Sequence, residues 1–390
     1  MDYSTSGSQW NMFLQDSYKP VRNLVIRGGF RYDNAVLRND VGDAVVTQSL
    51  WGPRLYASWD PFGDQKTKIA GGYGRFNDVG RLGVADFTRV ASFGQKIWYG
   101  EYQNSFTSDQ EDLVIHFQRN NPSFAHDTLK APRSDEFNFM VHREIMRDVG
   151  LKADFTFKRT RFIFEQDEVN LIRDEDGSAI IGSREGDPQI STQRLRTPEQ
   201  ARRSYFQSDF QLIKQEARRW FAQATYTYSM SLGTSRASMS GSFLNDPQTQ
   251  YNFGPMYESD IRHQVKAYGG WRLPTDPWNQ TIGASLVYLS GRPMERRYLG
   301  ESVDGAWNFG TRIRPRGVYT RYPAQFVANI QFQQEIDVRR GKLNVSASLM
   351  NMFSNRAATS VSSALNSEDR LFIYGRQGPM RIQVGAGYEF

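Results

Sequence analysis

Hydrophobic and polar residues alternate with a period of two along much of this chain. In the last segment, one face carries Met380, Ile382, Val384, Ala386, Tyr388 and Phe390, and the other carries Arg381, Gln383, Gly385, Gly387 and Glu389. The same alternation recurs over 24–32 and 151–158. Successive side chains of a β-strand point to opposite faces of a sheet, so this period predicts strands and is not typical of helices.

Counting such runs predicts thirteen strands. Their approximate bounds are 8–18, 23–35, 50–60, 66–77, 135–145, 150–168, 204–214, 219–232, 260–273, 278–291, 325–337, 342–353 and 371–390. The connections alternate between short and long. The short ones are 19–22, 62–65, 147–149, 215–218, 274–277 and 339–341, and the long ones are 36–49, 78–134, 169–203, 233–259, 292–324 and 354–370.

This alternation of connections favours a transmembrane β-barrel. Such barrels have tight turns on the periplasmic side and long loops outside the cell, and a soluble sandwich or propeller has no reason for that asymmetry. Lipid offers the backbone no hydrogen-bond partner, so a barrel closes its sheet and removes the open edges. We therefore predict an all-β, antiparallel, up-and-down transmembrane β-barrel, with 1–390 forming a single partial barrel domain.

The composition fits a barrel and excludes several other classes. Hydrophobic residues make up 39% of the chain and aromatic residues 14%. No stretch approaches the roughly 18 to 20 consecutive apolar residues that a membrane-spanning helix requires. The chain has no cysteine, so disulfides and thiolate metal sites are excluded. The net charge of +6 is spread along the chain without a basic run, so no nucleic-acid partner is expected.

The start of the chain and the strand count predict a larger parent protein. Residues 1–5 lack the basic and apolar regions of a secretory signal peptide. Thirteen strands is an odd number, whereas a single-chain bacterial barrel normally has an even number. We therefore expect further strands upstream, with Phe390 on the periplasmic side.

Several stretches, taken in order, resemble TonB-dependent receptors, particularly the large Oar-like group. They are 10–20 followed by 29–33, then 59–64 with 70–76, then Asp260-Ile261-Arg262-His263, then 290–293 and 349–356, and finally Gly387-Tyr388-Glu389-Phe390. The resemblance implies about 13 to 14 strands of a barrel of about 22. It also implies a place in the outer membrane of a Gram-negative bacterium, in a receptor that takes up a large or scarce solute with inner-membrane energy.

The same resemblance implies partners. These are outer-membrane lipid, an unknown extracellular solute, the barrel-assembly machinery and the TonB system. Neither a plug domain nor a TonB-contacting segment is found in the sequence, so TonB is expected to be reached only through a missing N-terminal region. Tyr388 and Phe390 resemble the terminal aromatic signal that the barrel-assembly machinery reads.

Residues that could carry chemistry are few. The four histidines lack metal-ligand spacing, so structural or solvated roles are expected for His116, His126, His142 and His263. The Gly71-Gly72-Tyr73-Gly74 run lacks the rest of a phosphate loop, and we interpret its glycines as room for close packing in a curved sheet. The acidic run 174–177 with Glu185 superficially resembles a calcium loop, but Ala179 stands where the turn needs glycine, which favours a solvated external loop.

Aromatic residues could serve either of two roles. Trp220, Tyr226, Tyr228, Trp271, Tyr288 and Tyr388 could stack on a sugar or belong to the aromatic girdles at the membrane interfaces, and their period favours girdles. No catalytic arrangement stands out, so an enzyme is not expected, and neither a cofactor nor a metal ligand is predicted. Substrate-binding residues stay unassigned because the polar face is uniform.

Two alternatives remain open at this stage. One is a structural or adhesive outer-membrane barrel that closes with a partner chain and presents its long loops. The other is a soluble β-propeller or sandwich that binds carbohydrate, whose strands would lack the alternation of short turns and long loops.

Overall fold

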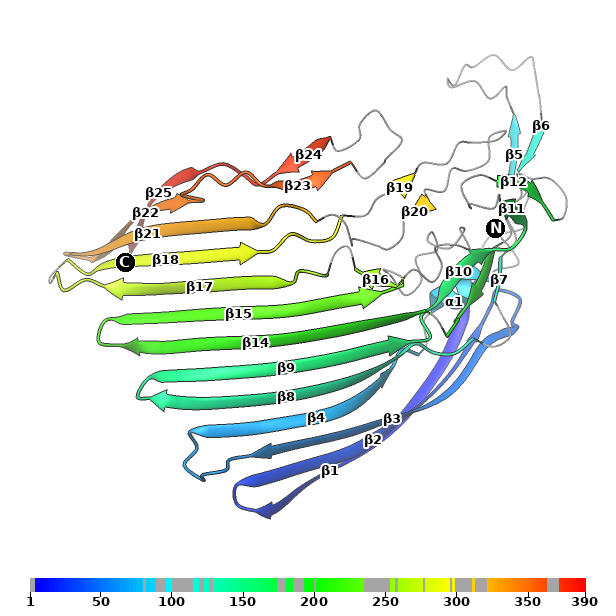
Figure 1. Ribbon diagram of the computed structural model, residues 1–390, viewed down its shortest axis with the longest axis horizontal. Helices are drawn as coiled ribbons and strands as arrows, with labels where there is room; N and C mark the ends of the chain where they lie inside the picture. Colours follow the sequence, from blue (N-terminus) through cyan, green and yellow to red (C-terminus); the bar gives the residue numbers. More distant parts are fainter. Residues whose placement is uncertain are drawn as a thin grey trace.

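Strands from both ends of the chain join one large antiparallel sheet in the computed structural model (Figure 1). The residues described are 4–79, 82–88, 96–99, 115–118, 123–125, 129–173, 180–184, 193–199, 201–234, 253–256, 259–275, 278–294, 297–298, 311–312, 321–362 and 372–390.

Thirteen strands follow one another across this sheet in chain order. They are β1 (Ser6–Val21), β2 (Leu24–Arg38), β3 (Ala44–Trp59), β4 (Thr67–Asn77), β8 (Arg133–Met146), β9 (Val149–Arg161), β14 (Arg202–Ala217), β15 (Trp220–Gly233), β17 (His263–Arg272), β18 (Gln280–Leu289), β21 (Gln325–Val338), β22 (Gly341–Met350) and β25 (Arg381–Glu389). A short fourteenth strand, β16 (Gly254–Pro255), pairs with β15. The up-and-down antiparallel order confirms the predicted fold class.

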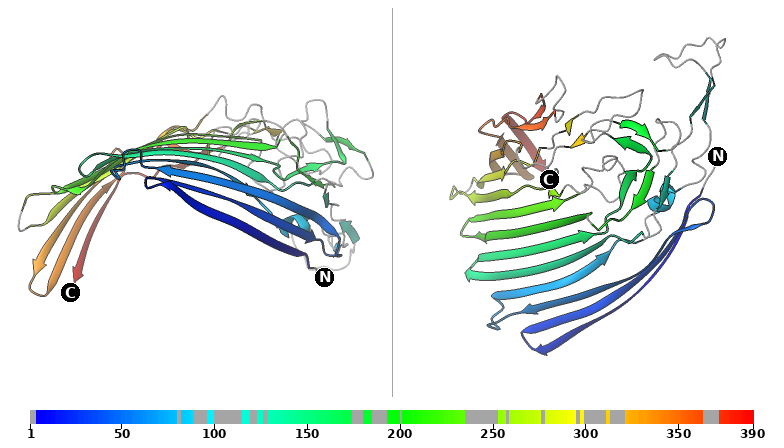
Figure 2. Two further views of the ribbon diagram at one scale, coloured as in Figure 1. Left: turned by 90° about the horizontal axis from the view of Figure 1, so that it is seen from below. Right: turned by 45° about the vertical axis from the view of Figure 1, so that its right-hand side comes forward.

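The sheet is an open arc (Figure 2). Its hydrogen-bonded path runs from β1 to β25, and these two end strands are not paired with each other. An open edge exposes unpaired backbone groups, which a membrane does not tolerate. The arc is therefore consistent with part of a barrel.

The short and long connections lie at opposite ends of the strands. The six predicted short turns lie at one end, on the left of Figure 1, and the longer connections lie at the other end, which we call the rim. One predicted long loop is wrong, because β2 and β3 extend through most of 36–49 and leave only 39–43 between them. Asn39 closes this tight turn, since its side-chain Oδ1 accepts hydrogen bonds from the backbone N–H groups of Val41 (3.3 Å) and Asp43 (2.9 Å).

Two predicted strands are shorter than the alternation suggested. The run 150–168 stops at Arg161, because Phe162 has a φ of 56° that an extended strand does not allow. The run 371–390 is divided in two, since Gly378 and Pro379 separate β24 (Ile373–Arg376) from β25. Proline lacks the N–H that a ladder needs.

Small elements occupy the rim connections. One six-residue helix, α1 (Leu82–Phe87), follows β4. The small sheets contain β5 (Lys96–Tyr99) with β6 (Ile115–Gln118), β7 (Ser123–Ala125) with β13 (Gln193–Arg196) and β10 (Glu165–Glu168), β11 (Leu171–Arg173) with β12 (Ile180–Ser183), β19 (Arg297–Tyr298) with β20 (Thr311–Arg312), and β23 (Ala358–Val361) with β24. Among the described residues, no helix is long and apolar enough to cross a membrane.

The two faces of the sheet differ in what covers them. The packed core at the rim joins Leu37 of β2 and Val46 of β3 to α1, together with Phe164 and Leu195. Leu37 and Val46 lie on the same face as buried Asp33 and Gln48, by the period-two alternation along β2 and β3. We call this covered face the inner face and the other the outer face.

Candidate functional site on the inner face and the rim

Polar side chains line the inner face of the central strands. Residues that lie directly opposite each other in paired strands have side chains on the same face of the sheet. The strand registers therefore identify the inner-face residues of β8, β9, β14, β15 and β17. Its members in these strands include Glu136, Asn138, His142, Lys152, Asp154, Thr156, Lys158, Gln207, Asp209, Gln211, Gln223, Thr225, Thr227, Gln264 and Lys266. A hollow of about 560 Å³ is lined by the members of this set from Gln207 to Lys266 and by Ser285 of β18.

Hydrogen bonds join these side chains across the strands. His142 Nε2 lies 2.6 Å from Asp154 Oδ1, and the Thr156 hydroxyl donates to Asn138 Oδ1 at 2.8 Å. Further along, Asp209 accepts hydrogen bonds from Gln207 and from the Thr227 hydroxyl. The inner face is thus a continuous surface of amides, hydroxyls and paired charges, as a water-filled lumen requires.

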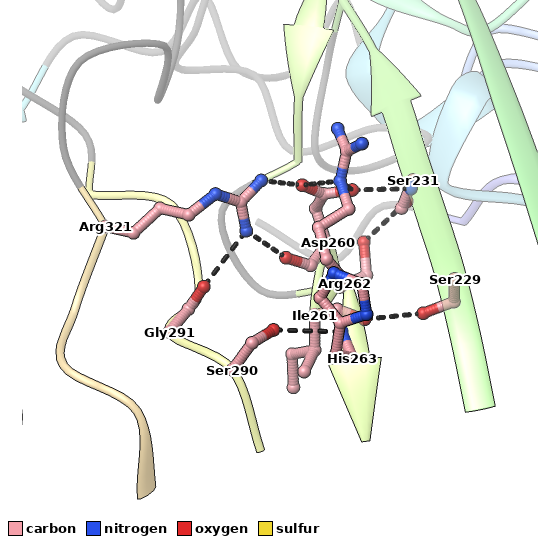
Figure 3. Close-up of polar contacts among 10 residues, drawn as sticks. Ser229, Ser231, Asp260, Ile261, Arg262, His263, Ser290, Gly291 and Arg321 are labelled. Atoms are coloured by element: carbon pink, nitrogen blue, oxygen red, sulfur yellow. Dashed lines mark hydrogen bonds and ion pairs between the residues drawn. The ribbon is translucent and has the colours of Figure 1, made fainter. Parts of the chain in front are cut away.

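A buried carboxylate organises the rim (Figure 3). Asp260 is completely buried, and the Nε of Arg262 lies 3.0 Å from both of its carboxylate oxygens. Arg321 also ion-pairs with this carboxylate, and the backbone N–H of Ser231 donates to it at 2.8 Å. Burial alone disfavours charged Arg262, but hydrogen bonding to Asp260 and Coulombic attraction from it outweigh that effect and raise the Arg262 pKa.

The Asp260 cluster ties three parts of the chain together. Ser231 belongs to β15, Asp260 and Arg262 precede β17, and Arg321 precedes β21 (Figure 3). Arg321 also donates to the backbone oxygens of Asp260 (2.9 Å) and Gly291 (3.0 Å). Nearby, the Ser290 hydroxyl accepts a hydrogen bond from the backbone N–H of His263 at 3.0 Å. The cluster therefore fixes where the connections after β15 and β18 leave the sheet.

The aromatic residues named from the sequence lie on the outer face. Trp220 lies directly opposite Trp271 at the short-turn end, and Tyr388 is near that end in β25. Nearer the rim, the Tyr226 hydroxyl contacts His263 Nδ1 at 2.9 Å, and the Tyr228 ring is 5.4 Å from the His263 ring. Tyr288 follows the same alternation in β18. These aromatic residues share the outer face and form one group at the short-turn end and another nearer the rim. This arrangement is the one expected of two interfacial girdles.

The other predicted residues are spread over the structure. His142 and His263 have the contacts given above, His116 lies in β6, and His126 lies outside the described residues. The acidic run 174–177 and Glu185 also lie outside the described residues. Gly72 fits the close-packing interpretation, since a Cβ there would lie 2.5 Å from the backbone oxygen of Leu55. Phe390 is fully exposed after β25, and its ring meets that of Tyr388 at 5.0 Å.

Sequence reasoning did not assign a role to the Asp260 cluster. The stretch 260–263 resembles a receptor motif, but nothing in the sequence connects Asp260 with Arg321, which lies 61 residues later. Three or more His, Cys, Asp or Glu side chains able to hold a metal together are not found in the described part of the chain.

Comparison with known proteins identifies the family. A family model described as an outer membrane beta barrel domain matches residues 35–287, which is more than half of the chain. The chain therefore belongs to this family of outer-membrane β-barrels. The placement in the Gram-negative outer membrane is confirmed.

Relatives place the chain within this class. It is 23% identical over 386 residues to the TonB-dependent transporter Oar of Myxococcus xanthus, an alignment covering 87% of this chain and 35% of that protein. The outer membrane transporter YddB from Escherichia coli has the same fold, with a TM-score of 0.64 and 12% identity over 98% of this chain and 45% of its own. The FrpB iron transporter from Neisseria meningitidis matches with a TM-score of 0.56 and 11% identity over 100% and 47%.

These matches confirm the predicted resemblance to the barrel of TonB-dependent receptors. The chain spans between about a third and a half of the length of these relatives. The alternative hypothesis of a soluble β-propeller or sandwich is therefore wrong.

Proposed function

We propose that this chain forms part of the wall of a TonB-dependent receptor that takes up a large, polar extracellular solute. The observation that carries the proposal is the arrangement of the rim. Connections there fold over the inner face, as the core around α1 shows, and the Asp260 cluster anchors two more of them. External segments held above a polar lumen form a binding surface at the entrance of a route through the barrel.

The chemistry of the inner face supports a polar solute. The hollow over β14, β15 and β17 is lined mainly by amides and hydroxyls, including Gln207, Gln223, Thr225 and Thr227, with Asp209 and Lys266 as charged members. Such groups exchange hydrogen bonds with a hydrated solute. Apolar parts of the lining at Leu286 and Val287 would pack against its carbon atoms. Siderophores, glycans and peptides all fit this description. The TonB system would supply the energy through parts of the protein outside this sequence.

We also propose that Tyr388 and Phe390 act as the signal for the barrel-assembly machinery. Tyr388 lies on the outer face of β25 with Ile382 and Val384, and Phe390 continues this spacing one residue beyond the end of the strand. All four side chains are exposed. An apolar row on an end strand of the sheet suits recognition by strand pairing in the membrane.

Uptake measurements test the transport proposal even when the solute has not been identified. The parent strain, a strain lacking this protein and a strain lacking TonB are grown in the same medium, and the solutes that each removes are compared by mass spectrometry. The account predicts at least one polar solute that only the parent removes. If the strain lacking TonB removes everything that the parent removes, energised uptake is wrong and a structural or adhesive barrel becomes the better account.

A further inference from the structure

Four arginines face outward at the rim ends of three adjacent strands. We call Arg133 of β8, Arg159 and Arg161 of β9, and Arg202 of β14 the arginine patch. Arg133 lies directly opposite Arg161, which in turn lies directly opposite Arg202. The strands lie side by side in Figure 1. The patch is on the outer face because its members continue the alternation of Phe137, Phe157 and Phe206.

Positive charge in the arginine patch is poorly compensated within the described part of the chain. None of its four arginines takes part in an ion pair between described residues. Asp135 lies opposite Arg159, but Arg75 (2.7 Å) and Tyr73 (2.6 Å) already engage its carboxylate. Like charges directly opposite each other destabilise a sheet, so this arrangement calls for an external anion.

Unused hydrogen-bonding capacity accompanies this charge. The Nε atoms of Arg133, Arg159 and Arg161 have no hydrogen-bond partner. Because these atoms are buried, a phosphate outside the barrel would meet the terminal nitrogens of the same guanidinium groups. Two guanidinium groups are held by aromatic rings, with Arg133 4.9 Å from the centre of Phe162 and Arg202 4.8 Å from that of Phe253. Cation–π contacts of this kind orient the guanidinium plane and leave donors for a ligand.

The height of the arginine patch matches the outer headgroup region. Arg159 is ten residues from Val149, where β9 begins at the short-turn end. At about 3.3 Å per residue and a tilt of about 40°, ten residues rise roughly 25 Å, which is the height of the apolar band of an outer-membrane barrel. The last exposed apolar side chains below are Phe137 and Phe157. Arg161, Arg133 and Arg202 lie further out still.

We propose that the arginine patch binds the phosphate groups of an anionic lipid in the outer leaflet. Guanidinium groups donate paired hydrogen bonds that match phosphate oxygens, and adjacent arginines can share one phosphate. The acyl chains of the lipid would pack on Phe137 and Phe157 directly below. A soluble anion on its way through the lumen would meet the inner face, which points the other way.

Lipid binding by the purified full-length protein tests this site. Native mass spectrometry from detergent measures retention of bis-phosphorylated lipid A and of its dephosphorylated form. The matched pair of variants is Arg161→Gln in the patch and Arg143→Gln, which is on the outer face at the short-turn end of β8. A triple variant, Arg133→Gln with Arg159→Gln and Arg161→Gln, removes most of the patch. Gel mobility before and after boiling reports whether each variant is folded.

The expected result is selective loss of the phosphorylated lipid. At about 1 kcal/mol for each arginine near an anionic lipid, Arg161→Gln weakens binding roughly fivefold and the triple variant roughly a hundredfold, while Arg143→Gln binds like the native protein. Equal binding of dephosphorylated lipid A, equal weakening by Arg143→Gln, or retention by a folded triple variant would overturn the proposal. Displacement of lipid A by inorganic phosphate would also overturn it and indicate a soluble anion. If the triple variant does not fold, the matched single variants decide.

Discussion

Single residues set the geometry of the rim, and Asp260 is the clearest case. Its carboxylate is fully buried, whereas Arg262 and Arg321 keep 27% and 30% of their side-chain surface exposed. Solvent screens such partly exposed partners, so the Coulombic part of each pair is modest. The larger contribution of Asp260 is to accept four hydrogen bonds from three separate segments of the chain.

Removing this carboxylate should loosen the connections that it anchors. We expect Asp260→Ala to lower the free energy of unfolding by about 1–3 kcal/mol, because the Ser231 N–H and two guanidinium groups lose their acceptor. Urea unfolding from lipid vesicles measures the change, and protease treatment of intact cells should cleave the connection after β18 faster. Arg321→Gln should reproduce the faster cleavage. Unchanged cleavage in both variants would show that the cluster does not anchor the rim.

Phe390, which directly follows β25, allows a test of the assembly proposal. Deleting Phe390 from the full-length protein should lower its amount in the outer membrane, because an exposed aromatic of the apolar row is lost. Quantitative immunoblotting of the membrane fraction measures this. Substitution of exposed Phe62, in a short turn, with Ala serves as the control and should leave the amount unchanged. Equal amounts with and without Phe390 would contradict the signal.

At the scale of the strand, the period-two pattern predicted the faces well. The alternation of side chains along each strand predicts which residues lie on the outer face. The registers confirm this prediction for β25, where Ile382 lies opposite Leu349 and Val384 opposite Ala347. The ends of strands were predicted less well. They depend on local events that the alternation does not record, such as the positive φ of Phe162 and the Asn39 turn. The Asp260–Arg321 pair was beyond sequence reasoning, because only the assembled sheet brings these residues together.

The face assignment of β25 predicts the effect of a charge. Val384→Lys should destabilise the barrel by about 2–4 kcal/mol if the site faces the middle of the bilayer. Gln383→Lys, one residue away on the inner face, should have little effect. Unfolding in urea from lipid vesicles distinguishes them. A larger effect at Gln383 than at Val384 would mean that the two faces are reversed.

The turn between β14 and β15 offers a stabilising change. Arg218 and Arg219 have φ values of 53° and 71°, a left-handed conformation that two-residue hairpin loops normally give to Asn and Gly. We expect Arg218→Asn to stabilise the hairpin by about 0.5–1 kcal/mol, because Asn tolerates this conformation better. The same unfolding assay measures it. A loss of stability would show that the Arg218 side chain has contacts of its own.

The whole molecule is an open arc of strands with a polar inner face and a rim that carries the longer connections. Sequence alternation and connection length were enough to predict this architecture, because a membrane imposes both on the chain. The solute could not be predicted, since the inner face is largely polar and the sequence of the long connections contains no binding motif that we recognise.

The membrane topology is the central claim, and cysteine labelling tests it most directly. The chain has no cysteine, so Val41→Cys in the rim turn and Arg147→Cys in a short turn can be introduced singly, with the unmodified protein as background. The account predicts that a membrane-impermeant maleimide labels Cys at position 41 on intact cells. At position 147 it should label only after the outer membrane is permeabilised. Labelling of position 147 on intact cells, or of both positions alike, would contradict the account.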